Sequence, residues 1–286
     1  MITDIKTDPF IFQWSVDVAG HEWKSGTDSE LRLFERGGFE RRIRVYHPLR
    51  RSGLFAEFAT LKPTREAILR FADRYGDLFG SYSDGDLLVE GGRFKGGATL
   101  KTWKAEIEDM HELVRIWEAI KGLNEKELKA FITWANGEVR YKITKRDSTL
   151  GVVLARPDFN EDLLKRFRPG DILPPARYAL QREINKRIVR SPTVPRLVWC
   201  PGDRPDDGTS PEPDHHQRLI FEPSNLLAAL WLQFAQAVTG EFQLRRCIAC
   251  GEYFQVGRGG KRSDSRTCGD ACRQRRRRKP QTIAPR

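Results

Sequence analysis

Hydrophobic and polar positions change their spacing along this chain of 286 residues, and each change predicts a different kind of element. Apolar residues alternate with polar ones over 10–18 and 42–46, so the first sixty residues read as half-buried strands and turns. Beyond them, apolar residues recur at helical spacing, which predicts a helix after Pro63-Thr64 that ends near Gly76. We expect further helices over about 100–121, 125–135, 177–188 and 224–239, and strands over 139–143, 151–155 and 218–221.

Glycine and proline mark the segments between these elements. The stretch 80–98 is rich in glycine and is expected to be loop, and the polar, proline-rich stretch 201–214 is expected to be a flexible loop. The pattern indicates the α+β fold class, with no regularity that names a particular fold. We divide the chain into a mixed α/β body (1–240), a C-terminal module (241–279) and a short tail (280–286).

The composition is that of a soluble globular protein, with 39% hydrophobic and 31% charged residues. No apolar stretch approaches the ~20 residues that span a bilayer, so no membrane partner is expected. The N-terminus lacks a basic start followed by an apolar segment, and we therefore expect a cytoplasmic protein. In a reducing compartment, clustered cysteines indicate metal binding or catalysis more often than disulfides.

The net charge of +11 is concentrated at one end of the chain. Residues 242–286 hold thirteen Lys or Arg against three acidic residues, a net charge of +10, which leaves +1 for the other 241 residues. Positive charge gathered on one small segment favours a polyanionic partner, whereas evenly spread charge would indicate only solubility.

Four of the five cysteines lie in the same segment, at Cys247, Cys250, Cys268 and Cys272. Two pairs with short internal spacing suit tetrahedral zinc, which takes four thiolates at about 2.3 Å. We expect a turn at the first pair, a strand over 253–256, a hairpin turn at 257–260 with a return over 262–266, and a helical turn carrying the second pair. That order is typical of a treble-clef finger with one structural Zn²⁺. Four cysteines leave no position for water, so catalytic zinc is not expected.

Other chemistries for these cysteines remain alternatives. A pair of disulfides lacks a secretory context, and a redox Cys-x-x-Cys site lacks a βαβ setting and does not explain the second pair. An iron–sulfur cluster would use the same four thiolates. Cys200 lies in an apolar strand and is expected to be a core residue, as are the tryptophans at 103, 117, 199 and 231.

A run of basic residues follows Cys272 and stops at Pro280. At 100° per residue these side chains surround a helix on every side, so the run cannot be core. It is either a solvated charged end or sorting signal, or a helix that contacts phosphates. Arginine dominates, and its forked donors suit phosphate oxygens and guanine edges. The candidate nucleic-acid-binding residues are Arg258, Lys261, Arg262, Arg266, Arg273, Arg275, Arg276, Arg277, Arg278 and Lys279, with Arg245 and Arg246 nearby.

The segment from Arg246-Cys-Ile-Ala-Cys-Gly through Gly259-Gly-Lys-Arg to Cys268-Gly-Asp-Ala-Cys-Arg-Gln-Arg resembles the CGNR-type zinc fingers of bacterial proteins. This chain has Cys272-Arg-Gln-Arg where the family's naming motif has Cys-Gly-Asn-Arg, and its second cysteine spacing differs. The resemblance covers about 35 residues. It implies a finger that follows a larger α/β domain and binds DNA in a bacterial transcriptional regulator.

The chain shows no recognisable set of nucleophile, base and orienting residue, which favours a non-enzymatic protein. The prediction is a cytoplasmic zinc-finger protein that binds nucleic acid, duplex DNA above all, and regulates transcription through a sensory or interaction body. The alternative comes from a different class. In it, the module is a zinc-stabilised protein-interaction element, and the body is an uncharacterised, possibly enzymatic, α/β domain.

Overall fold

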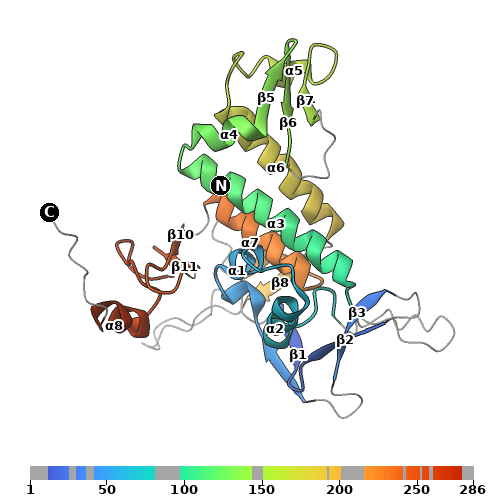
Figure 1. Ribbon diagram of the computed structural model, residues 1–286, viewed down its shortest axis with the longest axis vertical. Helices are drawn as coiled ribbons and strands as arrows, with labels where there is room; N and C mark the ends of the chain where they lie inside the picture. Colours follow the sequence, from blue (N-terminus) through green and yellow to red (C-terminus); the bar gives the residue numbers. More distant parts are fainter. Residues whose placement is uncertain are drawn as a thin grey trace.

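The computed structural model describes residues 12–25, 30–36, 42–80, 97–143, 151–191, 193–200, 216–240, 243–251, 253–257 and 260–278. Helices α3 (Leu100–Lys121) and α6 (Leu173–Arg190) lie side by side and carry a small sheet at one end, while the N-terminal strands lie at the other end (Figure 1). The C-terminal module lies against one side of the body (Figure 1). Most of the loops expected at 80–98 and 201–214, and the tail 280–286, lie outside the described residues.

Two antiparallel strand pairs form the N-terminal part, as the alternation predicts. Strand β1 (Trp14–Asp17) pairs with β4 (Ile43–Tyr46), and β2 (His21–Ser25) pairs with β3 (Leu31–Glu35). The expectation of strands and turns throughout the first sixty residues is wrong at one point, because a 3₁₀ turn (Pro48–Arg50) and helix α1 (Leu54–Ala59) follow β4. The α1 sequence Leu-Phe-Ala-Glu-Phe-Ala is almost wholly apolar, and this helix is buried against α3 and α7 (Leu226–Thr239).

Helices α2 (Arg65–Tyr75) and α3 (Leu100–Lys121) confirm the two helices that the spacing of apolar residues predicts. The side chains of Thr64 and Thr99 accept hydrogen bonds from backbone N–H groups in the first turns of α2 and α3, which satisfies donors that a helix start leaves free. Gly76 ends α2 at a φ of +89°, a conformation that glycine adopts without strain.

The helix expected over 125–135 is wrong in its second half. Helix α4 (Glu125–Phe131) ends early, and Ile132–Ala135 is strand β5, which pairs with β6 (Glu138–Tyr141). Asn136 and Gly137 connect them with φ values of +51° and +75°, the signature of a tight hairpin turn that requires positive φ at both positions. Strand β7 (Val152–Ala155) completes a three-stranded antiparallel sheet in the order β5-β6-β7.

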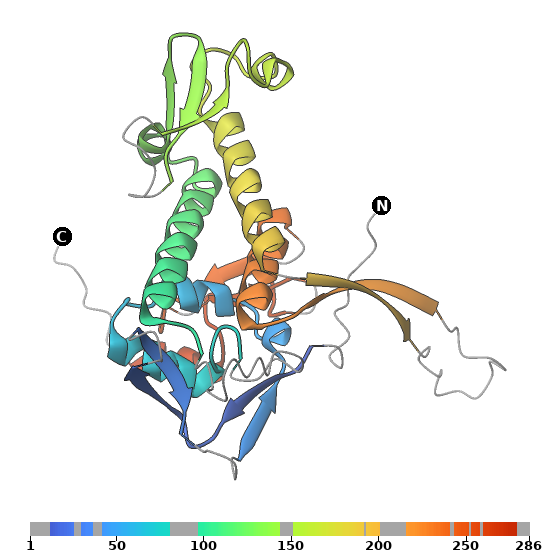
Figure 2. The same ribbon diagram turned by 90° about the vertical axis from the view of Figure 1, so that its right-hand side faces the viewer.

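The next helix is longer than its expected range of 177–188. After the short α5 (Glu161–Leu164), helix α6 spans Leu173–Arg190 and carries two prolines in its first turn, where a missing N–H costs nothing. Strands β8 (Thr193–Cys200) and β9 (His216–Pro223) form a two-stranded hairpin that we call the arm. It projects from the body near the end of α6 (Figure 2). The strand expected over 218–221 therefore belongs to a longer one.

The core of the body gathers around α3 and α7 (Leu226–Thr239). Trp103, Trp117 and Trp231 are buried there, as expected, together with the apolar face of α7 (Leu227, Leu230, Phe234). Nothing is described for the side chains of Trp199 and Cys200. Among the described residues, no helix combines the length and the apolar character that crossing a bilayer requires.

Candidate metal centre

The C-terminal module is built on a hairpin that begins before its first cysteine. Strand β10 (Gln243–Arg246) pairs antiparallel with β11 (Tyr253–Val256), and Cys247–Cys250 forms the turn between them. The chain returns after β11 as expected, since the Lys261 N–H donates to the Gln255 carbonyl over 2.9 Å, but 262–266 forms no strand, and the partner of β11 is β10. The stretch Gln-Leu-Arg-Arg already alternates, with Leu244 buried between exposed neighbours, and this supplies the partner strand.

The chain then turns back past the hairpin and enters helix α8 (Asp270–Arg278). Backbone hydrogen bonds tie this return to the turn, since the Ile248 N–H donates to the Arg266 carbonyl over 3.1 Å. Cys268 lies just before α8, and Cys272 lies in its first turn. The helix thus begins between two of the four thiols.

The sulfur atoms of Cys247, Cys250, Cys268 and Cys272 all lie within 4.8 Å of one another. Neighbouring sulfurs are 3.6 Å apart between Cys250 and Cys268, and 3.5 Å apart between Cys268 and Cys272. Four sulfurs arranged tetrahedrally at about 2.3 Å from a zinc ion would be separated by about 3.8 Å. The two cysteine pairs that were predicted from their spacing in the sequence therefore form one cluster, which can hold a metal ion. No other group of three or more potential ligands gathers in the described part of the chain.

Backbone geometry holds the first pair in place. Gly251 follows Cys250 at a φ of +78°, and its N–H donates to the Cys247 carbonyl over 2.8 Å. The Arg246 guanidinium in turn donates to the Gly251 carbonyl over 3.1 Å. A side chain at Gly251 would be strained by the positive φ, which explains why glycine follows the second cysteine.

The four thiols differ in their electrostatic surroundings. Burial disfavours the Cys247 thiolate, but the backbone N–H groups of Cys268, Ala249 and Cys250 donate to its sulfur and lower the pKa of Cys247 to about 6. Burial and the neighbouring sulfurs raise the pKa of Cys268 above its usual range. Four thiolates cannot share this space without a cation, and a bound metal ion reverses the second effect. The all-sulfur donor set suits zinc or an iron–sulfur centre rather than magnesium or calcium.

The module has a small core of its own. Phe254 and Val256 of β11 are buried against Cys247 and Cys272, with Ala249 and Cys268 packed at the edge. This cluster contains three of the four candidate ligands. The apolar side of β11 therefore supports the sulfur cluster directly.

A second set of contacts joins the module to the body, and sequence reasoning missed it. Leu244 is buried in the main core, and Tyr253 packs against that core and donates a hydrogen bond from its hydroxyl to Glu118 of α3. The β-carbon of Tyr253 lies so close to Gly53 that a β-carbon added there would approach it to 2.8 Å. In a finger that did not touch the body, Leu244 and Tyr253 would be exposed and would lack these partners.

The candidate nucleic-acid-binding residues fall into two groups. Lys261, Arg262, Arg266, Arg273, Arg275 and Arg276 are exposed, as are Arg245 and Arg246. Arg273 pairs with Asp270 over 3.1 Å, one turn earlier in α8. Arg277 and Arg278 belong to α8, but their side chains are not described, and Arg258 and Lys279 lie outside the described residues. These exposed lysine and arginine side chains are therefore accessible to a partner, and their binding of nucleic acid remains a prediction.

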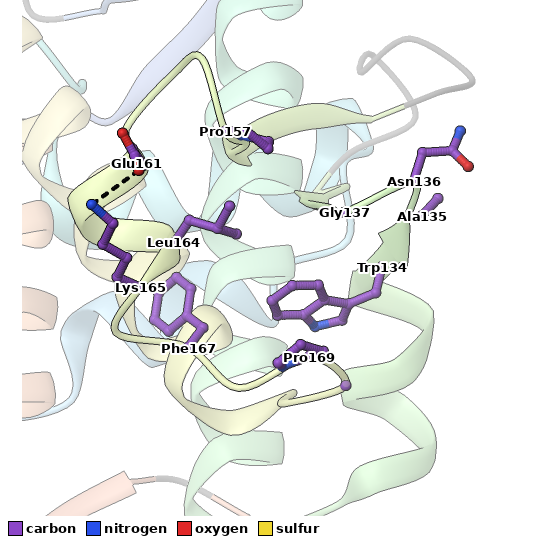
Figure 3. Close-up of a pocket in the computed structure, with 11 residues that line it drawn as sticks. Trp134, Ala135, Asn136, Gly137, Pro157, Glu161, Leu164, Lys165, Phe167 and Pro169 are labelled. Atoms are coloured by element: carbon purple, nitrogen blue, oxygen red, sulfur yellow. Dashed lines mark ion pairs between the residues drawn. The ribbon is translucent and has the colours of Figure 1, made fainter.

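A shallow pocket of about 480 Å³ lies at the far end of the body, around the β5–β6 turn (Figure 3). Its wall is mainly apolar and includes Trp134, Leu164 and Phe167, and the Glu161–Lys165 ion pair of 2.9 Å lies at its rim (Figure 3). The Trp134 indole N–H donates to the Asp171 carbonyl over 2.6 Å.

Comparison with known proteins found no matching family model, no matching curated protein and no matching solved structure. The resemblance to CGNR-type fingers therefore depends on the residues of the motif alone.

Proposed function

We propose that this chain is a zinc-finger DNA-binding protein that acts as a bacterial transcriptional regulator. In this proposal Cys247, Cys250, Cys268 and Cys272 hold one structural Zn²⁺ in a treble-clef-like module. The donor chemistry and the sulfur separations support zinc, which would close the tetrahedral shell and keep all four thiols deprotonated.

The observation that carries the proposal is the position of the basic helix relative to the sulfurs. Cys272 lies in the first turn of α8, and exposed arginines begin at the next residue. A metal ion bound there would fix the direction of the helix and hence of its guanidinium groups. A flexible charged tail would lose conformational entropy whenever its guanidinium groups were ordered on phosphates. An anchored helix has already lost much of that entropy before it binds.

The number of contacts limits what such a helix can do. Only one side of α8 can face a duplex at a time, so about three to five phosphate contacts are realistic once Lys261, Arg262 and Arg266 are included. Counterion release then gives a slope of about −3 to −4 in log affinity against log salt. The body would serve as the sensory or interaction part of the regulator.

The test is a salt titration of fluorescent duplex DNA with the full zinc-loaded chain, on two unrelated sequences. Replacing Arg275 and Arg276 by alanine should reduce the slope by one to two units and weaken binding to both duplexes alike. The matched control is Lys101→Ala with Lys104→Ala, two exposed bases near the start of α3. They lie about 20 Å or more along that helix from Glu118, which contacts the module.

The control variant should bind as the wild type does. If the wild-type chain shows no binding at low salt, the module is a protein-interaction or structural element, as the alternative states. Loss of binding to one duplex only would show that these arginines read bases rather than phosphates.

A further inference from the structure

Arginine is concentrated on the body beside the place where the module docks. Residues 42–51 contain four arginines and no acidic residue, although residues 1–241 together have a net charge of only +1. This segment comprises β4 and the 3₁₀ turn that follows it, and it ends two residues before Gly53, against which Tyr253 of the module lies. A local excess of positive charge on the body therefore lies next to the basic module.

Three arginines converge on a pair of tyrosines in this region. The guanidinium carbons of Arg51 and Arg74 lie 4.7 and 5.2 Å from the centre of the Tyr75 ring. That of Arg44 lies 5.8 Å from the centre of the Tyr46 ring, and the two ring centres are 6.1 Å apart. We call Arg44, Arg51 and Arg74 the body cluster. Contact with an aromatic face orients a guanidinium group, and all three side chains remain accessible to solvent.

The ion pairs of the body cluster leave a surplus of positive charge. Glu57 of α1 pairs with Arg51 over 3.1 Å and with Arg74 over 3.5 Å, and the Tyr75 hydroxyl donates to the same carboxylate. Arg44 donates to the Arg74 carbonyl and has no ion-pair partner in the described part of the chain. Three arginines against one glutamate give a charge of +2. Like charges held this close repel one another unless an anion lies between them.

A buried side chain of α7 fixes the backbone that carries Arg51. The Gln233 amide nitrogen donates to the carbonyl oxygens of Pro48 and Arg51 over 2.7 and 3.1 Å. The Gln233 side-chain oxygen accepts a hydrogen bond from the Phe55 N–H over 3.3 Å. Gln233 is 1% exposed, so these bonds would be costly to break. Donors on such a fixed segment lose less conformational entropy when they bind an anion.

The body cluster continues the basic surface of the module across the docking contact, because β11 lies beside α1 (Figure 1). Arg246 lies opposite Tyr253 in the hairpin, about 5 Å away, with its side chain on the same face. The α-carbon of Tyr253 is at most about 6 Å from that of Gly53, which is at most about 7 Å from that of Arg51. Arg246 and Arg51 are therefore separated by at most about 18 Å between α-carbons. One strand of B-DNA carries about five phosphates over that length.

We propose that the body cluster binds backbone phosphates of the same DNA duplex that the module holds. The inference rests on the proposed function and deepens it, because it gives the body a direct part in DNA binding. Guanidinium groups bind phosphate oxygens through paired N–H donors, and the phosphates would neutralise the surplus charge. Contacts to the backbone carry no sequence information. The body cluster therefore adds affinity and fixes the orientation of the duplex relative to the body.

The experiment adds a body variant, Arg44→Ala with Arg74→Ala, to the salt titration of the full zinc-loaded chain. Two further phosphate contacts add about −1.8 to the slope of log affinity against log salt. The wild-type slope should therefore be about −5 to −6, rather than the −3 to −4 that the module alone would give, and the body variant should return to about −3 to −4 on both duplexes. Arg51 remains to pair with Glu57, and far-UV circular dichroism with the thermal midpoint confirms that the variant is folded.

The matched control removes two positive charges at the opposite end of the body. Lys129→Ala with Lys165→Ala is suitable because each lysine is exposed and pairs with one glutamate, as Arg74 does. Lys129 belongs to α4 and Lys165 follows α5, at the end of α3 and α6 that carries the small sheet (Figure 1). This control should keep the wild-type slope. Arg44→Lys with Arg74→Lys should also keep it, because lysine neutralises a phosphate as a point charge.

The outcomes separate this inference from the proposed function. A wild-type slope of about −3 to −4 that the body variant leaves unchanged would overturn the inference and leave the proposed function standing. An equal loss of slope in the Lys129 and Lys165 control would also overturn it, because the effect would then follow total charge rather than position. A lysine variant with the slope of the alanine variant would do the same. A wild-type chain that binds no DNA at low salt would reject both proposals.

Discussion

Replacing Leu244 by alanine tests whether the module is docked on the body or merely attached to it. Leu244 belongs to β10, three residues before Cys247, yet its side chain is buried in the core of the body. The matched variant is Val256→Ala in β11. Val256 is buried as well, but in the small cluster around Cys247 and Cys272. The two substitutions therefore open cavities in different cores.

The size of the effect follows from burial. Leu→Ala removes about three carbon groups worth ~0.8 kcal/mol each, and incomplete closure of the cavity raises the cost to about 2–4 kcal/mol. In a domain of about 200 residues this lowers the thermal midpoint by roughly 4–16 °C. The loss should appear in unfolding of the body, followed by the fluorescence of its buried tryptophans, while the metal content stays at one ion per chain.

Val256→Ala should behave in the opposite way. It should leave the body's thermal midpoint within about 2 °C of the wild type, and it should weaken zinc binding about tenfold or more in competition with a chelator. If Leu244→Ala leaves the unfolding of the body unchanged, the packing of the module on the body does not exist in solution. If both variants changed the thermal midpoint of the body and the affinity for zinc to the same extent, the body and the module would share a single core.

Two further predictions concern the metal and the pH dependence. Purified protein should contain about one zinc ion per chain and Cys250→Ser none, by elemental analysis, and iron in place of zinc would contradict the zinc proposal. Burial disfavours the Glu183 carboxylate, but Lys186 and the Tyr141 hydroxyl outweigh this and lower the pKa of Glu183. The contribution of the Glu183 carboxylate to the free energy of unfolding is therefore complete above the usual glutamate pKa of about 4.3, and it is lost as pH falls below that value. The stability difference between wild type and Glu183→Gln, measured in urea, should shrink toward pH 3.5 or so, and a difference independent of pH would refute this.

The sequence predicted the features that depend on local spacing. The limits of α3 and the grouping of the four cysteines both follow from short-range patterns, namely an apolar stripe with an N-terminal threonine, and two close cysteine pairs. The same reasoning failed where the deciding contacts come from distant segments. Helix α1 forms because α3 and α7 cover it, and Leu244 and Tyr253 pack against the core of the body rather than within the module.

One error had a signal in the sequence itself. The range 125–135 contains good helix formers up to Phe131, and Asn136-Gly137 then marks a hairpin turn between two short strands. A prediction that gave the Asn136-Gly137 turn precedence over the helical spacing would have included strands β5 and β6. The docking of Tyr253 on Gly53 and Glu118 had no such signal, because it joins positions far apart along the chain.

The contacts of β10 and β11 with the body also decide where this protein can be divided. A fragment that begins at residue 241 keeps all four cysteines, but it brings Leu244 and Tyr253 to the surface without their partners. The remaining body would lose a covering strand pair above α1 and the end of α3. The segment from Lys261 to Arg278, in contrast, is tied to the rest of the module by a few backbone hydrogen bonds and by the sulfurs. A recombinant fragment should therefore keep the body and the module together, and within the module it is helix α8 whose place depends on the metal.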